Sequence, residues 1–252
     1  MTDIFTTNFE KYYDTEMYDQ LNEHSKVEMP ILLHWIKKEN RILELACGTG
    51  RLAIPLAEKG YEVTGVDLNE GMLQKAKEKA AQKNVTIPFY LQDCTQLSFP
   101  DQFDCFFMVG NSFQHFLTNQ SQNALLTSVS KHLTNNGIFI FDTRNPILAE
   151  LSKPDHYVTE FQDYRGYDVK EHHLETYEDG DQLLRCETQR KYFKNGEYLH
   201  SEQDSILLRY TYPLEMKRLL SSHGFKIEKS YGNWKGEDVT TNAPQMIFIC
   251  RK

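Results

Sequence analysis

The chain has 252 residues, of which 40% are hydrophobic, and this length and composition suit one globular domain with a sizeable insertion. The formal net charge of −8 argues against a surface that grips nucleic-acid phosphates, since that binding depends on clustered Lys and Arg. Five scattered cysteines without CxxC spacing, no run of membrane-spanning length and no signal-peptide pattern predict a cytoplasmic protein that binds neither nucleic acid nor membrane.

The first 150 residues alternate helical and strand patterns. Apolar residues at three- and four-residue spacing predict helices within residues 8–38, with Pro30 between them. In chain order, strands are predicted at 42–46, 61–68, 85–93, 103–110 and 137–143, and helices at 51–59, 71–83 and 119–134. Strand–helix–strand units need right-handed crossovers, so this order predicts an α/β fold with a doubly wound, mostly parallel sheet and helices on both faces.

The pattern changes after Pro146. Residues 155–210 hold β-rich runs separated by the turn sequences EDGD and KNGE, which predicts antiparallel strands. A helix at 213–225 and strands near 226–231 and 245–252 follow, and they bring the expected main sheet to seven strands.

These patterns predict two parts. Residues 1–150 and 211–252 would form the ligand-binding core, with a helical cover at its N-terminus. Residues 151–210 would form an antiparallel insertion, and we expect this insertion to act as a lid because loops at this place in such folds carry function.

The segment RILELACGTGR, residues 41–51, ends a strand in a loop of small residues. Ligands bind open parallel sheets at the carboxyl ends of the strands, where small residues let the backbone approach closely. Asp67 ends the second strand, where an acidic side chain can bind both hydroxyls of a ribose. Neither GxGxxG nor GxxxxGK[ST] is present, and Glu44 would repel a diphosphate but suits an ammonium and a sulfonium group. These features favour S-adenosylmethionine as the ligand.

The motifs LELACGTG, VTGVDLNEGML and LQDCTQL, in this order, resemble the first three motifs of the class I S-adenosylmethionine-dependent methyltransferases. The resemblance covers residues 40–146. The insertion and the ending HGFKIEKSYGNW are similar to small-molecule members, such as the amino-sugar N,N-dimethyltransferases and relatives of glycine N-methyltransferase. The family usually has glycine where this chain has Ala46, and a methyl group should still fit there.

The resemblance implies a set of cofactor-binding residues: Tyr13, Glu44, Ala46, Gly48, Gly50, Asp67, Leu68, Met72, Asp93, Cys94 and Val109. Within this set, Asp67 would bind the ribose, Asp93 the exocyclic amine of adenine, and Glu44 the ammonium group, through the loop or a water molecule. Asp93 could instead cap a turn, as Asp often does in such loops. Tyr12 and Tyr13 would belong to an N-terminal aromatic helix that covers the cofactor, or to a helix that only packs on the sheet.

Polar residues after the fourth and fifth strands are the candidates for acceptor binding and catalysis: Asn111, His115 and Arg144. His115 is the candidate base because histidine titrates near neutral pH, and a histidine that only supports the fold is an equal alternative. Arg144 could bind a carboxylate or phosphate of the substrate, or pair with Asp142 or a surface acid. His172 and His173 lack metal-ligand spacing, so we expect no metal.

We therefore expect in-line methyl transfer from S-adenosylmethionine to a small-molecule acceptor at nitrogen or oxygen. An RNA or protein methyltransferase is the alternative, weakened by the acidic charge and by the sequence GNSF where [ND]PP[YF] would stand. A catalytically inactive, cofactor-binding regulatory protein is a second alternative, and an oxidoreductase is a third. The sequence leaves open whether the protein forms a homodimer.

Overall fold

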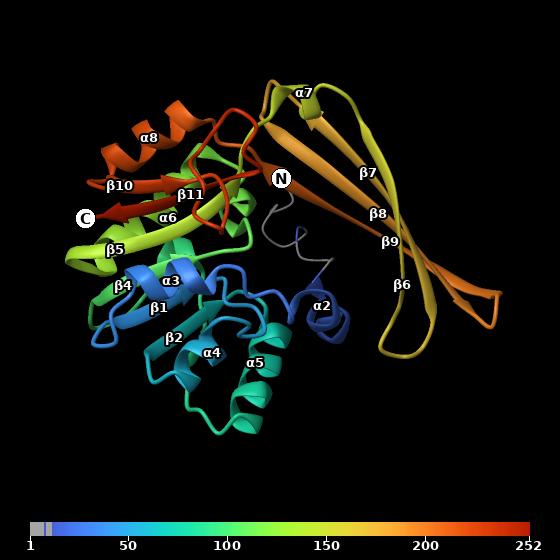
Figure 1. The fold of residues 1–252 in the computed structure, drawn as a ribbon, viewed down its shortest axis with the longest axis horizontal. Coiled ribbons are helices and arrows are strands. Elements are labelled where there is room, and N and C mark those ends of the chain that lie inside the picture. Colours follow the sequence, from blue (N-terminus) through green and yellow to red (C-terminus); the bar gives the residue numbers. More distant parts are fainter. Residues whose placement is uncertain (1–7, 9–11) are drawn as a thin grey trace.

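The structure is a computed structural model that describes residue 8 and residues 12–252. It contains a seven-stranded sheet flanked by helices and a four-stranded antiparallel sheet that projects from it (Figure 1). No helix in the described residues is long and apolar enough to cross a membrane.

The seven-stranded sheet has the order β10-β11-β5-β4-β1-β2-β3. Its strands are β1 (Arg41–Leu45), β2 (Glu62–Asp67), β3 (Phe89–Leu91), β4 (Phe103–Met108), β5 (Leu133–Arg144), β10 (Lys226–Tyr231) and β11 (Gln245–Arg251). The pairs among β1–β5 are parallel, whereas β11 is antiparallel to both β5 and β10. The prediction of a doubly wound, mostly parallel, seven-stranded sheet is confirmed.

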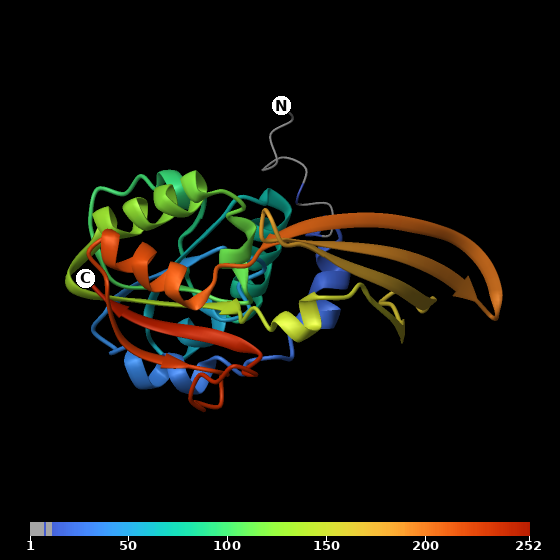
Figure 2. The same ribbon diagram turned by 90° about the horizontal axis from the view of Figure 1, so that it is seen from above.

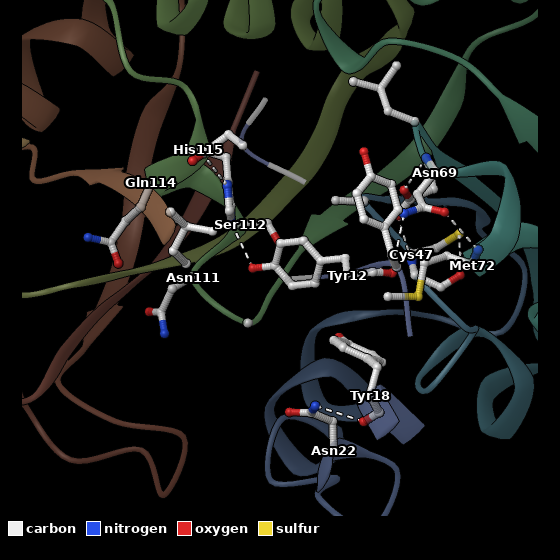
Figure 3. A pocket seen from close by; sticks show the side chains of 18 of the residues that line it. Tyr12, Tyr18, Asn22, Cys47, Asn69, Met72, Asn111, Ser112, Gln114 and His115 are labelled. Carbon is white, nitrogen blue, oxygen red and sulfur yellow. Dashed lines mark hydrogen bonds between the residues drawn. The ribbon is translucent and has the colours of Figure 1, made fainter. Parts of the chain in front are cut away.

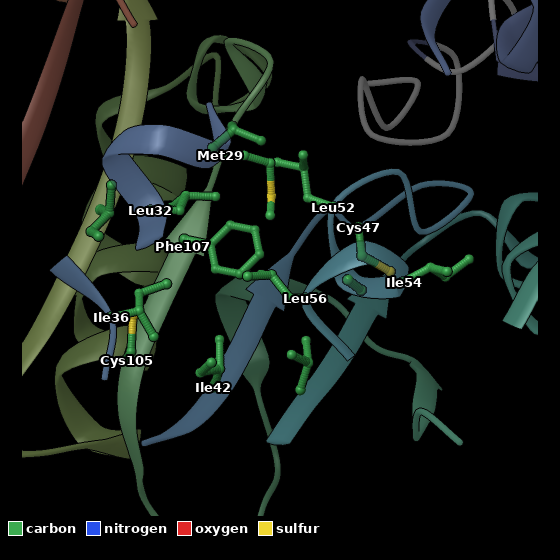
Figure 4. Close-up of a cluster of buried hydrophobic side chains, with 14 of the residues drawn as sticks. Met29, Leu32, Ile36, Ile42, Cys47, Leu52, Ile54, Leu56, Cys105 and Phe107 are labelled. Atoms are coloured by element: carbon green, nitrogen blue, oxygen red, sulfur yellow. The ribbon is translucent and has the colours of Figure 1, made fainter. Parts of the chain in front are cut away.

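Helices cover both faces of this sheet. Successive residues of a strand point to opposite faces, and here both faces carry buried apolar side chains that pack against helices. The helices on one face are α3 (Met29–Trp35), α4 (Ala53–Glu58) and α5 (Glu70–Gln82), and those on the other are α6 (Asn119–His132) and α8 (Pro213–Ser222). In β4, Phe107 belongs to the first core and Phe106 to the second. Figure 4 shows Phe107 beside Leu32 of α3 and Leu56 of α4.

The N-terminal region differs from the prediction. The helices are α2 (Thr15–Asn22) and α3, and Pro30 lies in the first turn of α3 instead of between helices. Proline is tolerated there because the first-turn N–H groups lack intrahelical partners. Asp14 begins α2, since its side chain accepts a hydrogen bond from Met17 N at 2.9 Å. Residues 9–11 of the predicted helical region lie outside the described residues.

The third strand is shorter than the predicted 85–93, since β3 spans only Phe89–Leu91. Pro88 directly precedes it, and proline cannot donate a hydrogen bond to a neighbouring strand.

The insertion forms the second sheet, in the order β6-β7-β8-β9. Its strands are β6 (Asp155–Gln162), β7 (Asp168–Glu178), β8 (Leu183–Lys194) and β9 (Glu197–Arg209), and α7 (Leu148–Leu151) leads into it. The EDGD turn joins β7 to β8 and the KNGE turn joins β8 to β9, as predicted. Figure 2 shows the long strands of this sheet curving away from the helical core.

Helix α2 lies between the two sheets (Figure 1). Its Met17 packs in a cluster with Val169 of β7 and Tyr192 of β8, and Gln20 Nε2 donates to the carbonyl of Gln162 at 2.5 Å. The N-terminal helix therefore contacts the insertion directly.

The order of the strands reverses between β1 and β4, which are neighbours in the sheet although β2 and β3 come between them in the chain. Such a switch point leaves a crevice at the carboxyl ends of the strands, where ligands bind in open α/β sheets. The loop after β1 and the residues after β2, β3, β4 and β5 all reach this edge.

Candidate functional site

A cavity of about 870 Å³ lies at this edge of the sheet. All of the predicted cofactor-binding residues except Gly50 line it, together with Asn111, His115 and Arg144. Figure 3 shows these surroundings, with Tyr12 between the residues that follow β4 and those near the loop after β1. The structure therefore brings both sets of predicted site residues to one cavity.

The loop after β1 needs left-handed backbone at three positions. Ala46, Gly48 and Gly50 have φ of +52°, +53° and +79°. A Cβ on Gly50 would also lie 3.1 Å from a carbon of Ile54, so this glycine serves the left-handed backbone and the packing against α4, whereas it does not line the cavity. Ala46 adopts the conformation that favours glycine, which gives a physical reason for the family's usual residue there.

Replacing Ala46 with glycine is expected to stabilise the protein by roughly 0.5 to 1 kcal/mol, because relief of left-handed strain exceeds the added flexibility of the unfolded chain. Urea unfolding measures the change. Ala81→Gly, at an exposed position in α5, is the matched control and should destabilise by about 1 kcal/mol. A loss of stability in Ala46→Gly equal to that of the control would show that the backbone of Ala46 is unstrained.

Asp67 links the end of β2 to this loop. Its Oδ2 accepts a hydrogen bond from Gly48 N at 2.8 Å, and its Oδ1 accepts one from Asn69 N at 2.9 Å. Burial raises the pKa of Asp67, while the hydrogen bonds from Asn69 and Gly48 oppose that rise. Each carboxylate oxygen can still accept a second hydrogen bond, so the pair can face two hydroxyl groups.

Glu44 of β1 is only 3% exposed, and it lines the cavity. Its Oε2 has no hydrogen-bond partner among the described residues. Burial raises the pKa of Glu44 to about 8. A buried carboxyl without a full set of partners fits a ligand that brings positive charge, as the ammonium and sulfonium groups of S-adenosylmethionine do.

The pKa of Glu44 predicts how stability changes with pH. The pKa of about 8 in the folded protein lies above the ordinary value of 4.5, so between these pH values the folded protein binds more protons than the unfolded chain. The free energy of unfolding should therefore fall as pH rises from about 5 to 8.

Glu44→Gln should reduce that fall by a few kcal/mol, at about 1.4 kcal/mol for each unit of pKa shift. Burial also raises the pKa of Asp142, to about 7, and this contribution of the same sign is present in both proteins. Urea unfolding at several pH values measures the difference, and parallel curves for the two proteins would contradict the assignment to Glu44.

The residues predicted to bind adenine also line the cavity. Asp93 Oδ1 accepts hydrogen bonds from Thr95 N at 2.7 Å and Thr95 Oγ1 at 2.8 Å at the start of the short helix η2 (Cys94–Gln96). Asp93 therefore does cap a turn, the alternative considered above, and it lines the cavity as well. Met72 and Val109 are buried in the wall of the cavity, and Leu68 is exposed at it.

Cys94 follows Asp93 and also lines the cavity. Burial raises the pKa of the Cys94 thiol to about 12, so the thiol stays protonated at neutral pH. This side chain is therefore no nucleophile, and only its backbone N–H would serve the predicted contact with adenine.

The N-terminal aromatic residues have distinct positions. Tyr13 is 68% exposed, whereas Tyr12 reaches into the cavity and its hydroxyl lies 3.1 Å from His115 Nε2. Burial raises the pKa of Tyr12, so the phenol stays protonated. Tyr18 of α2 lies against Gly48, and its ring would be 3.9 Å from a Cβ there. Sequence reasoning named Tyr12 only as part of a covering helix and did not identify Tyr18.

Polar contacts hold α2 on the loop. Thr49 Oγ1 donates to Asp19 Oδ1 at 2.5 Å, and Lys79 Nζ of α5 lies 3.0 Å from both oxygens of Asp19. Arg51 binds Glu28, which begins α3, in a two-pronged ion pair at 2.8 and 2.6 Å. These charge-assisted contacts hold α2 and the start of α3 against the loop after β1.

The tautomer of His115 follows from its neighbours. Asn8 Oδ1 accepts from Leu207 N at 2.7 Å and Asn8 Nδ2 donates to Leu207 O at 2.9 Å, which fixes the orientation of the amide. Its Nδ2 therefore faces His115 Nδ1, at 3.2 Å, as a donor. Nδ1 accepts this hydrogen bond, so the proton lies on Nε2 and faces Tyr12 Oη. His115 in this arrangement orients Tyr12 and does not offer Nε2 as a base.

His115→Gln is consequently expected to lower turnover by about tenfold or less, since glutamine can keep one hydrogen bond to Tyr12. A general base would cost about 100-fold or more. The pH profile of kcat and the affinity for S-adenosylmethionine should not change. A loss of 100-fold together with a shifted acidic limb would assign the base role to His115.

Arg144, at the end of β5, does not pair with Asp142. Its Nη1 lies 3.6 Å from Glu175 Oε2 of β7, so it joins the main sheet to the insertion. Asp142 is buried and accepts hydrogen bonds from Asn111 N at 2.8 Å and Trp234 Nε1 at 3.1 Å. The carboxylate of Asp142 therefore positions the turn that carries Asn111.

The inner face of the antiparallel sheet completes the cavity with four polar residues of β7, β8 and β9: Glu171, Arg190, Tyr192 and Glu202. Arg190 Nε donates to Glu171 Oε1 at 2.5 Å, and its Nη1 binds Asp204. His173 lies on this face with Glu171, whereas His172 points to the opposite face, as the alternation of a strand requires. The described residues include no group of three or more His, Cys, Asp or Glu that could hold a metal ion.

Comparisons with known proteins agree on the kind of domain. A family model described as "Methyltransferase domain" matches residues 42–137. A glycine/sarcosine N-methyltransferase from Aphanothece halophytica is 31% identical to this chain, over 87% of this chain and 81% of that protein. Among solved structures, the CcbJ methyltransferase from Streptomyces caelestis has a TM-score of 0.82 at 20% identity, covering 99% of this chain and 98% of that chain.

The structure of SAM-bound CalS10, an amino pentose methyltransferase from Micromonospora echinaspora, has a TM-score of 0.69 at 15% identity. It covers 100% of this chain and 97% of that chain. Both solved structures therefore share the fold of this chain over nearly its whole length.

Proposed function

Because the chain belongs to the S-adenosylmethionine-dependent methyltransferases, we propose that it methylates a small-molecule acceptor, at nitrogen or oxygen, by in-line displacement. S-adenosylmethionine supplies a methyl group that its sulfonium already activates. The residues of this chain bind the two partners, exclude water and align them, and positioning alone can contribute several kcal/mol.

One observation supports a small acceptor above all. The cavity that holds the predicted cofactor residues also holds Asn111, His115 and Arg144, and Tyr12 and the inner face of the β6–β9 sheet border it. The cavity volume of about 870 Å³ suits a cofactor and a small partner.

Within this proposal the β6–β9 sheet is the lid. Its support is the set of contacts that it makes with the N-terminal cover and the main sheet: Met17 with Val169 and Tyr192, Asn8 with Leu207, and Arg144 with Glu175. Gly48, Asp67 and Glu44 would bind the cofactor. Asn111 and Tyr12, the latter oriented by His115, would position the acceptor.

Nitrogen is favoured as the methylated atom, because the curated relative from Aphanothece is named for N-methylation. A cytoplasmic location is supported by the five cysteines, which are all buried. A cofactor-binding regulatory protein without catalysis would need none of the polar groups around Tyr12.

Screening with labelled S-adenosylmethionine tests the proposal. Amines, amino sugars, amino acids and phenols are incubated with the wild-type protein, and label in a product smaller than the protein is the expected result. Tight cofactor binding without transfer to any of these compounds would favour the regulatory alternative.

A further inference from the structure

Gln114 is a buried polar residue that the proposed function does not yet use. It lies in the short helix η3 (Ser112–His115) after β4, is fully buried and lines the cavity. Its Nε2 donates to the carbonyl of Arg209 at 3.4 Å. Its Oε1 has no hydrogen-bond partner among the described residues.

The orientation of this amide is determined by its neighbour. A backbone carbonyl only accepts, so Nε2 must face Arg209 O, and Oε1 is left as an acceptor with nothing to accept. Leaving a buried acceptor unpaired is unfavourable, which makes a donor from a bound molecule the natural partner.

Gln114 is on the acceptor side of the cavity. Figure 3 shows Gln114 and Asn111 on the His115 side of Tyr12, away from Cys47 and Met72 near the loop after β1. The amide of Gln114 binds the carbonyl of Arg209 in β9, and β9 also contributes Leu208 and Ile206 to the cavity wall. A hydrogen bond beside such apolar walls discriminates strongly between ligands that can make it and ligands that cannot.

The charges around the cavity narrow the class of ligand. Three arginines line the cavity, and each is already paired with carboxylates of this chain: Arg51 with Glu28, Arg144 with Glu175, and Arg190 with Glu171 and Asp204. Glu202 also lines it, and its Oε2 accepts from Tyr192 at 2.9 Å. A phosphate or carboxylate on the acceptor would therefore have to compete with these carboxylates for each arginine.

On the basis of the proposed function, we propose that the acceptor is a neutral or cationic molecule that donates an N–H or O–H to Gln114 Oε1 and brings no anionic group. Gln114 is then a residue that selects the acceptor. It does not take part in the displacement itself.

The probes are ethanolamine, its O-methyl and N,N-dimethyl derivatives, and O-phosphoethanolamine. With labelled S-adenosylmethionine, wild-type kcat/KM should be highest for ethanolamine. For at least one of the two methylated derivatives, kcat/KM should be about tenfold or more lower than for ethanolamine. In Gln114→Met, which keeps the size of the side chain but removes the acceptor oxygen, the kcat/KM values of ethanolamine and this derivative should differ by about threefold or less.

Gln122→Met is the matched control. Gln122 is an equally buried glutamine in α6, whose Nε2 donates to Thr211 Oγ1 at 2.9 Å, and it does not line the cavity. Its substitution should lower stability without changing the ratio between the probes. Calorimetry should give both variants the wild-type affinity for S-adenosylhomocysteine.

Four results would overturn the inference: unchanged discrimination in Gln114→Met, an equal change in Gln122→Met, a preference for O-phosphoethanolamine, or no transfer to any of these probes. The last result leaves the proposed function standing if the wild type methylates another small molecule. Absence of methyl transfer to every small molecule, by contrast, overturns both.

Discussion

Replacing Asp67 with alanine is expected to weaken the binding of S-adenosylmethionine and of its demethylated product by at least about 100-fold. Hydrogen bonds to a charged group contribute about 1.5 to 3 kcal/mol each, and two ribose hydroxyls would lose theirs. The substitution also frees Gly48 N and Asn69 N, which the carboxylate now holds at 2.8 and 2.9 Å. Calorimetric titration with both ligands measures the effect.

Asp67→Asn serves as the control for shape, because it keeps the size of the side chain but removes the charge and one acceptor oxygen. We expect its affinity to lie between those of the wild type and Asp67→Ala. Wild-type affinity in Asp67→Ala would refute the ribose assignment.

Replacing residues 155–209 with a short linker is expected to lower turnover by about 1,000-fold or more and to leave cofactor affinity within a few fold. Closure that positions the acceptor and excludes water can supply effects of this size. The main sheet should survive, because neither of the two core clusters on its faces contains a residue of this segment. Circular dichroism and urea unfolding check that the variant folds.

The control for this variant is Asn195→Asp. Asn195 and Gly196 form the turn between β8 and β9, which is exposed and does not line the cavity. This substitution should leave turnover unchanged. Full turnover in the linker variant would show that the insertion does not serve as the lid.

The fold was predictable because its signals are local. Alternating apolar residues and helical spacing indicate the strands and helices of a parallel sheet, and EDGD and KNGE indicate the hairpins. Pro30 was misleading because proline both separates helices and begins them, and the sequence alone does not decide which. The side chain of Asp14, which begins α2, was the better marker.

The position of the loop after β1 and of Asp67 after β2 at one edge of the sheet was also predictable, since the topology of the sheet fixes it. The acceptor side was not. Asn8 contacts Leu207 across 199 positions of sequence and His115 across 107, and no local pattern reports such pairs. The tautomer of His115 and the pairing of Arg144 with Glu175 likewise depend on where the insertion folds back.

The most direct test is methyl transfer from labelled S-adenosylmethionine to a cell extract that has been divided by ultrafiltration into small molecules and macromolecules. We expect the wild-type protein to label a compound in the small-molecule fraction, and Asp67→Ala at the same cofactor concentration to label none. Label that enters only RNA or protein would contradict the proposed function.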